Sequence, residues 1–281
     1  ARLYYFDAQG IEDAIALATT MTGGLLSYGD SRPIIKPLNP AKAAENGIFS
    51  AMLAHEGIQG PTEALEGPNG WFHAVTDKVN AQFLRKTDHL LLHDCYFKLY
   101  PSCRHTHCGI DAAIVLHNKI NIEDVDEINV YIYPSAIKLA GIKIPKDKDE
   151  TKFSICYTLA CALLNGKYGI TDMQPVNLSE EIITLINKTT LIPDVSMENR
   201  NKGIRGTRVE ILLKEGRKIT ETVLAPKGDP ENPLTQADII SKLRICAQGQ
   251  AGEDILDRLV EGVKAIKGND VFKNPMNILI E

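Results

Sequence analysis

The sequence lacks the features that identify several large classes of protein. Its 281 residues contain no apolar run long enough to cross a bilayer, and we expect no signal peptide. Because 36 Asp and Glu residues outnumber 31 Lys and Arg residues, the net charge of −5 offers no general attraction to nucleic acid or to an anionic membrane. We therefore expect a soluble protein of one large domain or two, in which an anionic ligand needs a local basic pocket.

The six cysteines lack the dense spacing of a disulfide-rich secreted scaffold and lie mostly in apolar or helical contexts. This usage indicates a reducing environment, so we expect a cytoplasmic protein.

Several catalytic motifs are also missing. No Gly-rich phosphate loop follows an expected strand, and neither G-x-S-x-G nor H-E-x-x-H occurs. Nucleotide hydrolysis, dinucleotide redox chemistry and serine hydrolysis are therefore disfavoured. What remains is a cofactor-free site built from Lys, His, Arg and helix N-termini, which suits a small polycarboxylate.

The first part of the chain has helical patterns. Residues 11–21 form one apolar, Ala-rich run, and a second helix is expected to run to His55, with Asn39 as its N-cap and Pro40 as its first residue. Gly47 lies in the middle of this second helix, where glycine lowers helix propensity, so we expect it to mark a close helix–helix contact.

The middle of the chain predicts an α+β unit, and the C-terminal part returns to helices. Period-two alternation predicts a strand at 126–133, with Ile128, Val130 and Ile132 on one face. The further expected elements are strands 207–213 and 219–223 joined as a hairpin, helices 154–164 and 178–186, a capping box at 235–238, and a last helix at 252–266.

The segment from Tyr100 to Ala113 contains the densest group of reactive side chains. Helical spacing begins near Thr106 or His107, so the free amide groups of a helix N-terminus are expected there. Arg104 offers a planar fork suited to a carboxylate, although it is equally compatible with a structural arginine that clamps loop carbonyls. His107 is open to two interpretations with equal weight: a functional residue, or a core histidine satisfied by backbone groups.

The same segment permits a zinc hypothesis through Cys103, His105, His107 and Cys108. This spacing matches no common zinc signature, and four ligands so close in sequence rarely close a tetrahedron. A metal is therefore disfavoured.

Lys36 lies three residues before Asn39, so its ammonium group is expected beside the first turn of that helix. An anion site is one interpretation, and an ordinary solvated loop lysine is the more frequent one.

Several segments together resemble the MmgE/PrpD family of 2-methylcitrate dehydratases, cis-aconitate decarboxylases and iminodisuccinate epimerases. They are Lys36-Pro-Leu-Asn-Pro-Ala-Lys-Ala-Ala44, Gly60-Pro61, Leu65-Glu-Gly67, Tyr100-Pro-Ser-Cys-Arg-His-Thr-His107, Lys152-Phe-Ser-Ile-Cys-Tyr157 and Lys227-Gly-Asp-Pro-Glu-Asn-Pro-Leu234. The resemblance implies a mainly α fold, in which an all-α domain formed by residues 1–97 and 233–281 carries an inserted α+β lid domain at 98–232.

The resemblance also implies a chemistry and a set of site residues. The family abstracts a proton from carbon next to a carboxylate without a cofactor, leading to dehydration, decarboxylation or epimerisation. By this similarity His107 transfers the proton, Lys36 binds carboxylate and stabilises charge, Arg104 orients a second carboxylate, and Tyr157 is a weaker match to a lid tyrosine. We expect alanine at Lys36 or His107 to spare the fold, because both are expected at helix mouths.

Two departures from the family pattern qualify these expectations. Asn39 and Ala41 replace the His and Gly of the usual K-x-L-H-P-G sequence, although Asn still caps a helix. Family members also carry a long additional N-terminal region that supplies an Asp and further His residues to the site. We therefore expect a homodimer or a complementing N-terminal chain, and the alternative is a non-catalytic fragment or subunit that binds a carboxylate or a partner.

Overall fold

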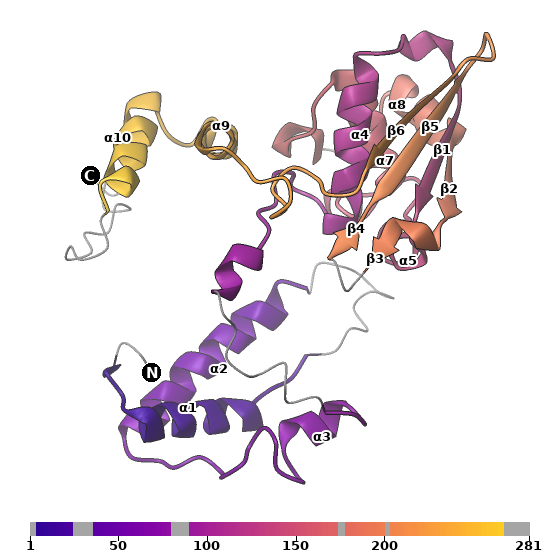
Figure 1. The fold of residues 1–281 in the computed structure, drawn as a ribbon. Coiled ribbons are helices and arrows are strands. Elements are labelled where there is room, and N and C mark those ends of the chain that lie inside the picture. Colours follow the sequence, from indigo (N-terminus) through magenta and orange to yellow (C-terminus); the bar gives the residue numbers. More distant parts are fainter. Residues whose placement is uncertain (1–3, 25–35, 80–89, 174–177, 200–202, 267–281) are drawn as a thin grey trace. The chain divides into compact units, whose positions relative to one another are not determined.

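The computed structural model describes residues 4–24, 36–79, 90–173, 178–199 and 203–266 (Figure 1). Contacts divide the chain into two compact units, residues 1–89 and residues 90–281, which are described separately. In the described part of the chain, no helix combines the length and the apolar character needed to cross a membrane.

The first unit is helical in its described residues. It contains α1 (Ala8–Thr20), α2 (Leu38–His55) and the short α3 (Trp71–Val75), and α1 packs along α2. Asp7 caps α1 by accepting a hydrogen bond from the Gly10 amide at 2.9 Å. The Asp13 side chain of the same helix accepts from the Gly60 amide at 3.0 Å, which holds the following loop against α1.

The start of α2 differs from the sequence prediction by two residues. The helix begins at Leu38 after Pro37, so Asn39 lies inside the first turn and is not the N-cap. Pro40 is tolerated there because the first four amides of a helix have no partner within the helix, and a missing N–H costs nothing. The predicted end is confirmed, since α2 stops at His55 and Gly57 adopts a φ of +83°.

The close contact predicted at Gly47 is wrong for the described residues. Gly47 is exposed, and a Cβ atom added there would meet nothing within 4 Å. The buried residues of α2 are Ser50 and Ala51, one turn further along the helix.

A four-stranded mixed sheet organises the second unit, with the strand order β2-β1-β5-β6. The strands are β1 (Val125–Ile132), β2 (Thr189–Pro193), β5 (Thr207–Leu213) and β6 (Lys218–Val223); β1 and β2 are parallel, and the other neighbours are antiparallel. A small ribbon of β3 (Glu198–Asn199) and β4 (Ile204–Arg205) precedes β5.

The predicted strand faces are confirmed. Ile128, Val130 and Ile132 are completely buried, as are Val209 and Ile211 on the neighbouring strand β5. The period of two in these β-branched side chains places them all on the face that the helices cover. The hairpin between β5 and β6 also forms where the sequence predicted it.

Helices α4 (His107–His117) and α7 (Ile155–Asn165) pack against each other, and α4 lies beside β5 and β6 (Figure 1). Helix α7 is capped by Ser154, whose hydroxyl accepts from the Tyr157 amide at 3.0 Å, and it ends at Gly166 with a φ of +66°. The remaining helices around this core are α5 (Pro134–Ala140), α6 (Lys148–Thr151) and α8 (Glu180–Lys188).

Two further helices end the described chain. Helix α9 (Gln236–Ala247) begins with the predicted capping box of Thr235 and Asp238, and α10 (Glu253–Lys264) follows it. The fold is therefore mainly α with a small mixed sheet, as the sequence predicted. The finer division at residues 97/98 and 232/233, with a lid inserted into one helical domain, stays a prediction.

Candidate active site

His107 is the first residue of α4, as the helical spacing predicted. Thr106 precedes it as N-cap, but its side chain does not cap the helix. The Thr106 hydroxyl instead donates to the Cys103 carbonyl at 2.9 Å and lies 2.7 Å from the Ser102 hydroxyl. The helix therefore starts without a side-chain acceptor at its positive end, where the dipole favours an anion.

Burial and neighbouring cations keep the His107 imidazole neutral. The side chain is only 1% exposed, and its Nε2 atom has no hydrogen-bond partner in the described structure. Loss of hydration lowers the pKa of His107 to about 3, with further lowering by the positive charges of Arg104, Lys98 and Lys242 and an opposing effect of the Ser102 backbone. Burial and the positive charges of these three residues thus both favour the neutral imidazole.

The burial of His107 corrects the expectation of an open helix mouth. The edge of the imidazole meets the Tyr100 ring, with 5.2 Å between the ring centroids, and both side chains belong to the interior. An alanine at position 107 would therefore leave a cavity, so we expect this variant to lose stability, contrary to the expectation from the sequence.

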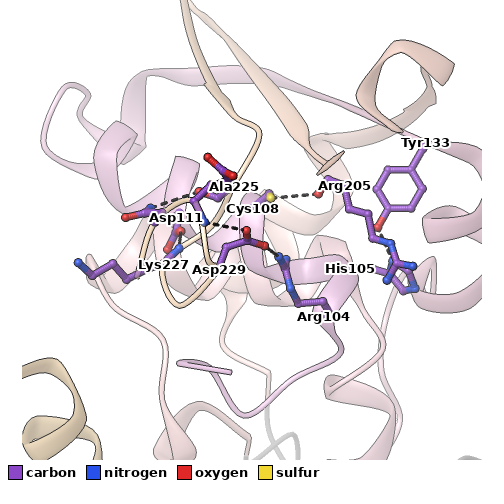
Figure 2. A network of polar contacts seen from close by, with 11 residues as sticks. Arg104, His105, Cys108, Asp111, Tyr133, Arg205, Ala225, Lys227 and Asp229 are labelled. Carbon is purple, nitrogen blue, oxygen red and sulfur yellow. Dashed lines mark hydrogen bonds and ion pairs between the residues drawn. The ribbon is translucent and has the colours of Figure 1, made fainter. Parts of the chain in front are cut away.

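Arg104 lies within a 3-10 turn (Arg104–Thr106) before α4 and is also buried, with 8% of its surface exposed. Its Nη2 atom donates to Asp229 Oδ2 at 2.5 Å (Figure 2). Its guanidinium carbon lies 4.8 Å from the centre of the Tyr96 ring. Nη1 is buried and has no partner among the described residues. Arg104 is thus paired with a carboxylate on one edge, stacked on an aromatic ring, and left with one unsatisfied donor.

The other members of the proposed zinc set make protein contacts. His105 Nδ1 hydrogen-bonds to the Tyr133 hydroxyl, and the Cys108 thiol donates to the Arg205 carbonyl at 3.1 Å (Figure 2). Burial raises the pKa of Cys108 to about 12, so this sulfur stays protonated and is a poor metal ligand. Within the described ranges, no group of three or more His, Cys, Asp or Glu residues could hold a metal ion.

Asp111 lies one helical turn beyond His107 and joins α4 to two other segments. It accepts a hydrogen bond from the Tyr100 hydroxyl, and its second oxygen accepts from the Lys227 amide at 2.7 Å. Burial raises the pKa of Asp111, and these hydrogen bonds oppose the rise. The Asp111 side chain of α4 therefore holds in place the Tyr100 ring that contacts His107.

Tyr157 lies on α7 and is 3% exposed. Its hydroxyl donates to the backbone carbonyl of Asp172, and burial raises its pKa well above the usual value. The structure thus gives Tyr157 a hydrogen bond of its own, and its role in a site stays a prediction.

Lys36 belongs to the first unit and is exposed in the turn that leads into α2. Its carbonyl accepts from the Asn39 amide at 3.3 Å, and no side chain caps the helix that follows. This agrees with the predicted setting of a lysine beside a helix N-terminus. The structure brings Arg104 and His107 together in the second unit, and the participation of Lys36 in the same site stays a prediction.

Sequence reasoning missed Lys98, Lys242 and Asp229. Lys98 hydrogen-bonds to the Ser102 carbonyl at 3.2 Å, and Lys242 on α9 donates to the Lys98 carbonyl. Lys98 stands two residues before the segment singled out above, so its position was a usable signal. Lys242 sits in an ordinary polar helix pattern, which gives no such signal.

Two parts of the chain match the two domains of one protein family. Residues 1–84 match the MmgE/PrpD N-terminal domain, and residues 100–264 match the MmgE/PrpD C-terminal domain. The chain belongs to the MmgE/PrpD family. It is similar to cis-aconitate decarboxylase of Homo sapiens, with 25% identity over 265 residues that cover 91% of this chain and 54% of the human protein.

Cis-aconitate decarboxylase of Aspergillus terreus is 25% identical over 262 residues, which cover 84% of this chain and 52% of the fungal protein. The mouse protein with the same name is 22% identical over 265 residues, covering 91% of this chain and 54% of that protein. The chain thus spans about half the length of the curated relatives it matches.

Proposed function

We propose that this chain forms the active-site wall of a cofactor-independent lyase or isomerase that acts on a small polycarboxylate. The observation that carries the proposal is the buried His107 at the start of α4, three residues after Arg104, with the positive charges of Arg104, Lys98 and Lys242 near enough to lower its pKa. Polycarboxylates carry the complementary charge, and a neutral imidazole is the form of histidine that accepts a proton. Family membership and the names of the relatives support a lyase of this type.

The proposed roles follow from the position of each group. Arg104 and Lys98 bind substrate carboxylates, and Lys36 adds a further positive charge from the start of α2. His107 Nε2 exchanges a proton with the carbon next to a carboxylate, and the cations stabilise the negative charge that develops there. Tyr157 stays a weaker candidate for the same site.

Substrate binding itself prepares His107 for this role. Burial, and to a smaller extent the nearby cations, lower the pKa of His107 to about 3, which makes a weak base. A bound polycarboxylate offsets the part of this shift that comes from the cations and so raises the pKa, while the part that comes from burial remains. Since His107 is 1% exposed, we expect Nε2 to become accessible to substrate only after a local rearrangement.

Three outcomes are compatible with such a site. In decarboxylation, the electron pair of the bond to the departing carbon dioxide stays on carbon, which then receives a proton. In dehydration, carbon loses a proton and hydroxide leaves as water after protonation. In epimerisation, the proton is removed and returned on the other face. The names of the relatives favour decarboxylation of cis-aconitate as the first reaction to test.

The test is a panel of citrate-, aconitate- and aspartate-derived polycarboxylates in heavy water, followed by proton NMR and by release of carbon dioxide. The protein is isolated with a tag from its own host, so that a second copy or a complementing chain stays bound. We expect one member of the panel to lose carbon dioxide or water, or to exchange a C–H next to a carboxylate. If none reacts and yet one binds, the non-catalytic binding function is correct instead.

A further inference from the structure

The loop after β6 returns to the candidate site through three contacts. The Lys227 amide donates to Asp111 Oδ2 at 2.7 Å, the Phe97 amide donates to the Gly228 carbonyl at 2.8 Å, and Asp229 pairs with Arg104 at 2.5 Å. Figure 2 shows the Asp229 carboxylate pointing at the Arg104 guanidinium from the side of this loop. The loop is therefore fixed to both ends of the segment that carries His107.

The surroundings of Gly228 show how closely this loop approaches Phe97. Gly228 has a φ of +94°, and a Cβ atom there would lie 2.1 Å from the Phe97 carbonyl oxygen. A side chain is excluded at this position on both grounds, so the backbone geometry beside Asp229 depends on glycine.

Each carboxylate oxygen of Asp229 has a separate partner. Oδ2 pairs with Arg104 Nη2, while Oδ1 accepts from the Glu231 amide at 3.3 Å within the loop. The side chains of Arg104 and Asp229 are only 9% and 16% exposed, so little water competes for the ion pair. The pair is therefore an orienting contact, since a buried charged hydrogen bond has a narrow range of favourable geometry.

We propose that Asp229 is a positioning residue that sets the substrate affinity of the site through Arg104. Asp229 fixes one edge of the guanidinium, and the Tyr96 ring covers one of its faces at 4.8 Å. Nη1 is buried and has no hydrogen-bond partner among the described residues, and we assign it as the donor to a substrate carboxylate. The inference rests on the proposed function, because it assigns that carboxylate to Arg104.

Asp229→Asn is the variant that separates this role from a general structural one. Asparagine keeps an oxygen for the Glu231 amide and replaces the oxygen facing Arg104 by a donor, so the loop contact stays while the ion pair is lost. Glu231→Gln is the matched control, because it also removes one acidic charge from this loop, at an exposed position.

The readout is the division of the effect between KM and kcat. For Asp229→Asn we expect KM to rise about tenfold and kcat to stay within about twofold, since a misplaced charged hydrogen bond weakens binding by that order. The dissociation constant of the unreactive tricarballylate, measured by calorimetry, should rise by the same factor. Glu231→Gln should leave KM, kcat and this dissociation constant unchanged.

A double-mutant cycle tests whether Asp229 acts through Arg104. If Asp229 acts through Arg104, then Asp229→Asn has no further effect on tricarballylate binding in an Arg104→Lys background. Asp229→Glu retains the charge one methylene further out and should give an intermediate KM, which serves if the asparagine variant fails to fold.

Two failures are distinguishable. Wild-type protein that neither turns over nor binds any polycarboxylate overturns the proposed function. Wild-type protein that is active, combined with an unchanged KM in Asp229→Asn or with additive effects in the cycle, overturns only the role of Asp229.

Discussion

The imidazole of His107 meets the ring of Tyr100 edge to face, with 5.2 Å between the ring centroids and 68° between the planes. The Tyr100 hydroxyl in turn donates to Asp111, one turn along the same helix. His107 is thus enclosed by its own segment while three cations act on it. This combination makes His107 both a candidate proton carrier and a source of pH-dependent stability.

The enclosure of His107 predicts a specific loss of stability in acid. Its pKa is about 3 in the folded protein and 6.5 in the unfolded chain, so the unfolded chain binds more protons between these values. The free energy of unfolding therefore falls as the pH drops below 6.5, by at most about 1.4 kcal/mol per pH unit from this group. Urea denaturation between pH 7 and pH 4 should show this slope in the wild type and a shallower one in His107→Asn.

The raised pKa of Asp111 has the opposite sign, but it is present in both proteins and cancels in their difference. Equal slopes for the two proteins would mean that His107 titrates normally, and the low pKa would be wrong.

Replacing Lys36 should reduce turnover without a loss of stability. The side chain is exposed before α2, so we expect Lys36→Met to change the free energy of unfolding by no more than about 0.5 kcal/mol. If Lys36 stabilises the charge on a substrate carboxylate, kcat/KM should fall by about a hundredfold. Lys42→Met is the control, since Lys42 lies exposed within α2 itself and pairs with Glu45 at 2.9 Å. Equal activity of the two variants would show that Lys36 is an ordinary surface lysine.

The end of α7 provides a test of the packing around α4. Gly166 has a φ of +66°, and a Cβ atom there would lie 2.8 Å from the His117 ring, whose Nδ1 hydrogen-bonds to the Leu163 carbonyl at 2.7 Å. Gly166→Ala should therefore lower the free energy of unfolding by about 2 kcal/mol or more through strain and overpacking. Gly216→Ala, with a φ of +86° and open space around the new Cβ, should cost only about 1 kcal/mol. Equal losses would show that backbone strain alone decides the effect at Gly166.

The elements set by local patterns were predictable from the sequence. Alternation identified the buried face of β1, and the Thr235-x-x-Asp238 pattern identified the start of α9, because each signal lies within a few adjacent residues. The start of α2 was displaced because a proline is acceptable anywhere in the first turn of a helix, so Pro40 does not mark the first residue.

The surroundings of the site residues were harder to predict from the sequence than the helices and strands. His107 is buried although it stands at an ordinary helix start, and Arg104 is paired with an aspartate 125 residues further along the chain. No local spacing encodes such a pair. The sequence therefore indicated the residue types of the site, and the low pKa and the orientation of the guanidinium came only from the fold.

The most direct test of the central claim compares His107→Asn with His117→Asn on the reactive polycarboxylate in heavy water. Both histidines lie on α4, but His117 hydrogen-bonds to a backbone carbonyl at the far end of the helix. We expect His107→Asn to lose about a hundredfold or more in the rate of proton transfer to or from carbon, as for removal of a general acid–base group. His117→Asn should keep the wild-type rate while folded. Wild-type rates in His107→Asn would contradict the assignment of His107 as the proton carrier.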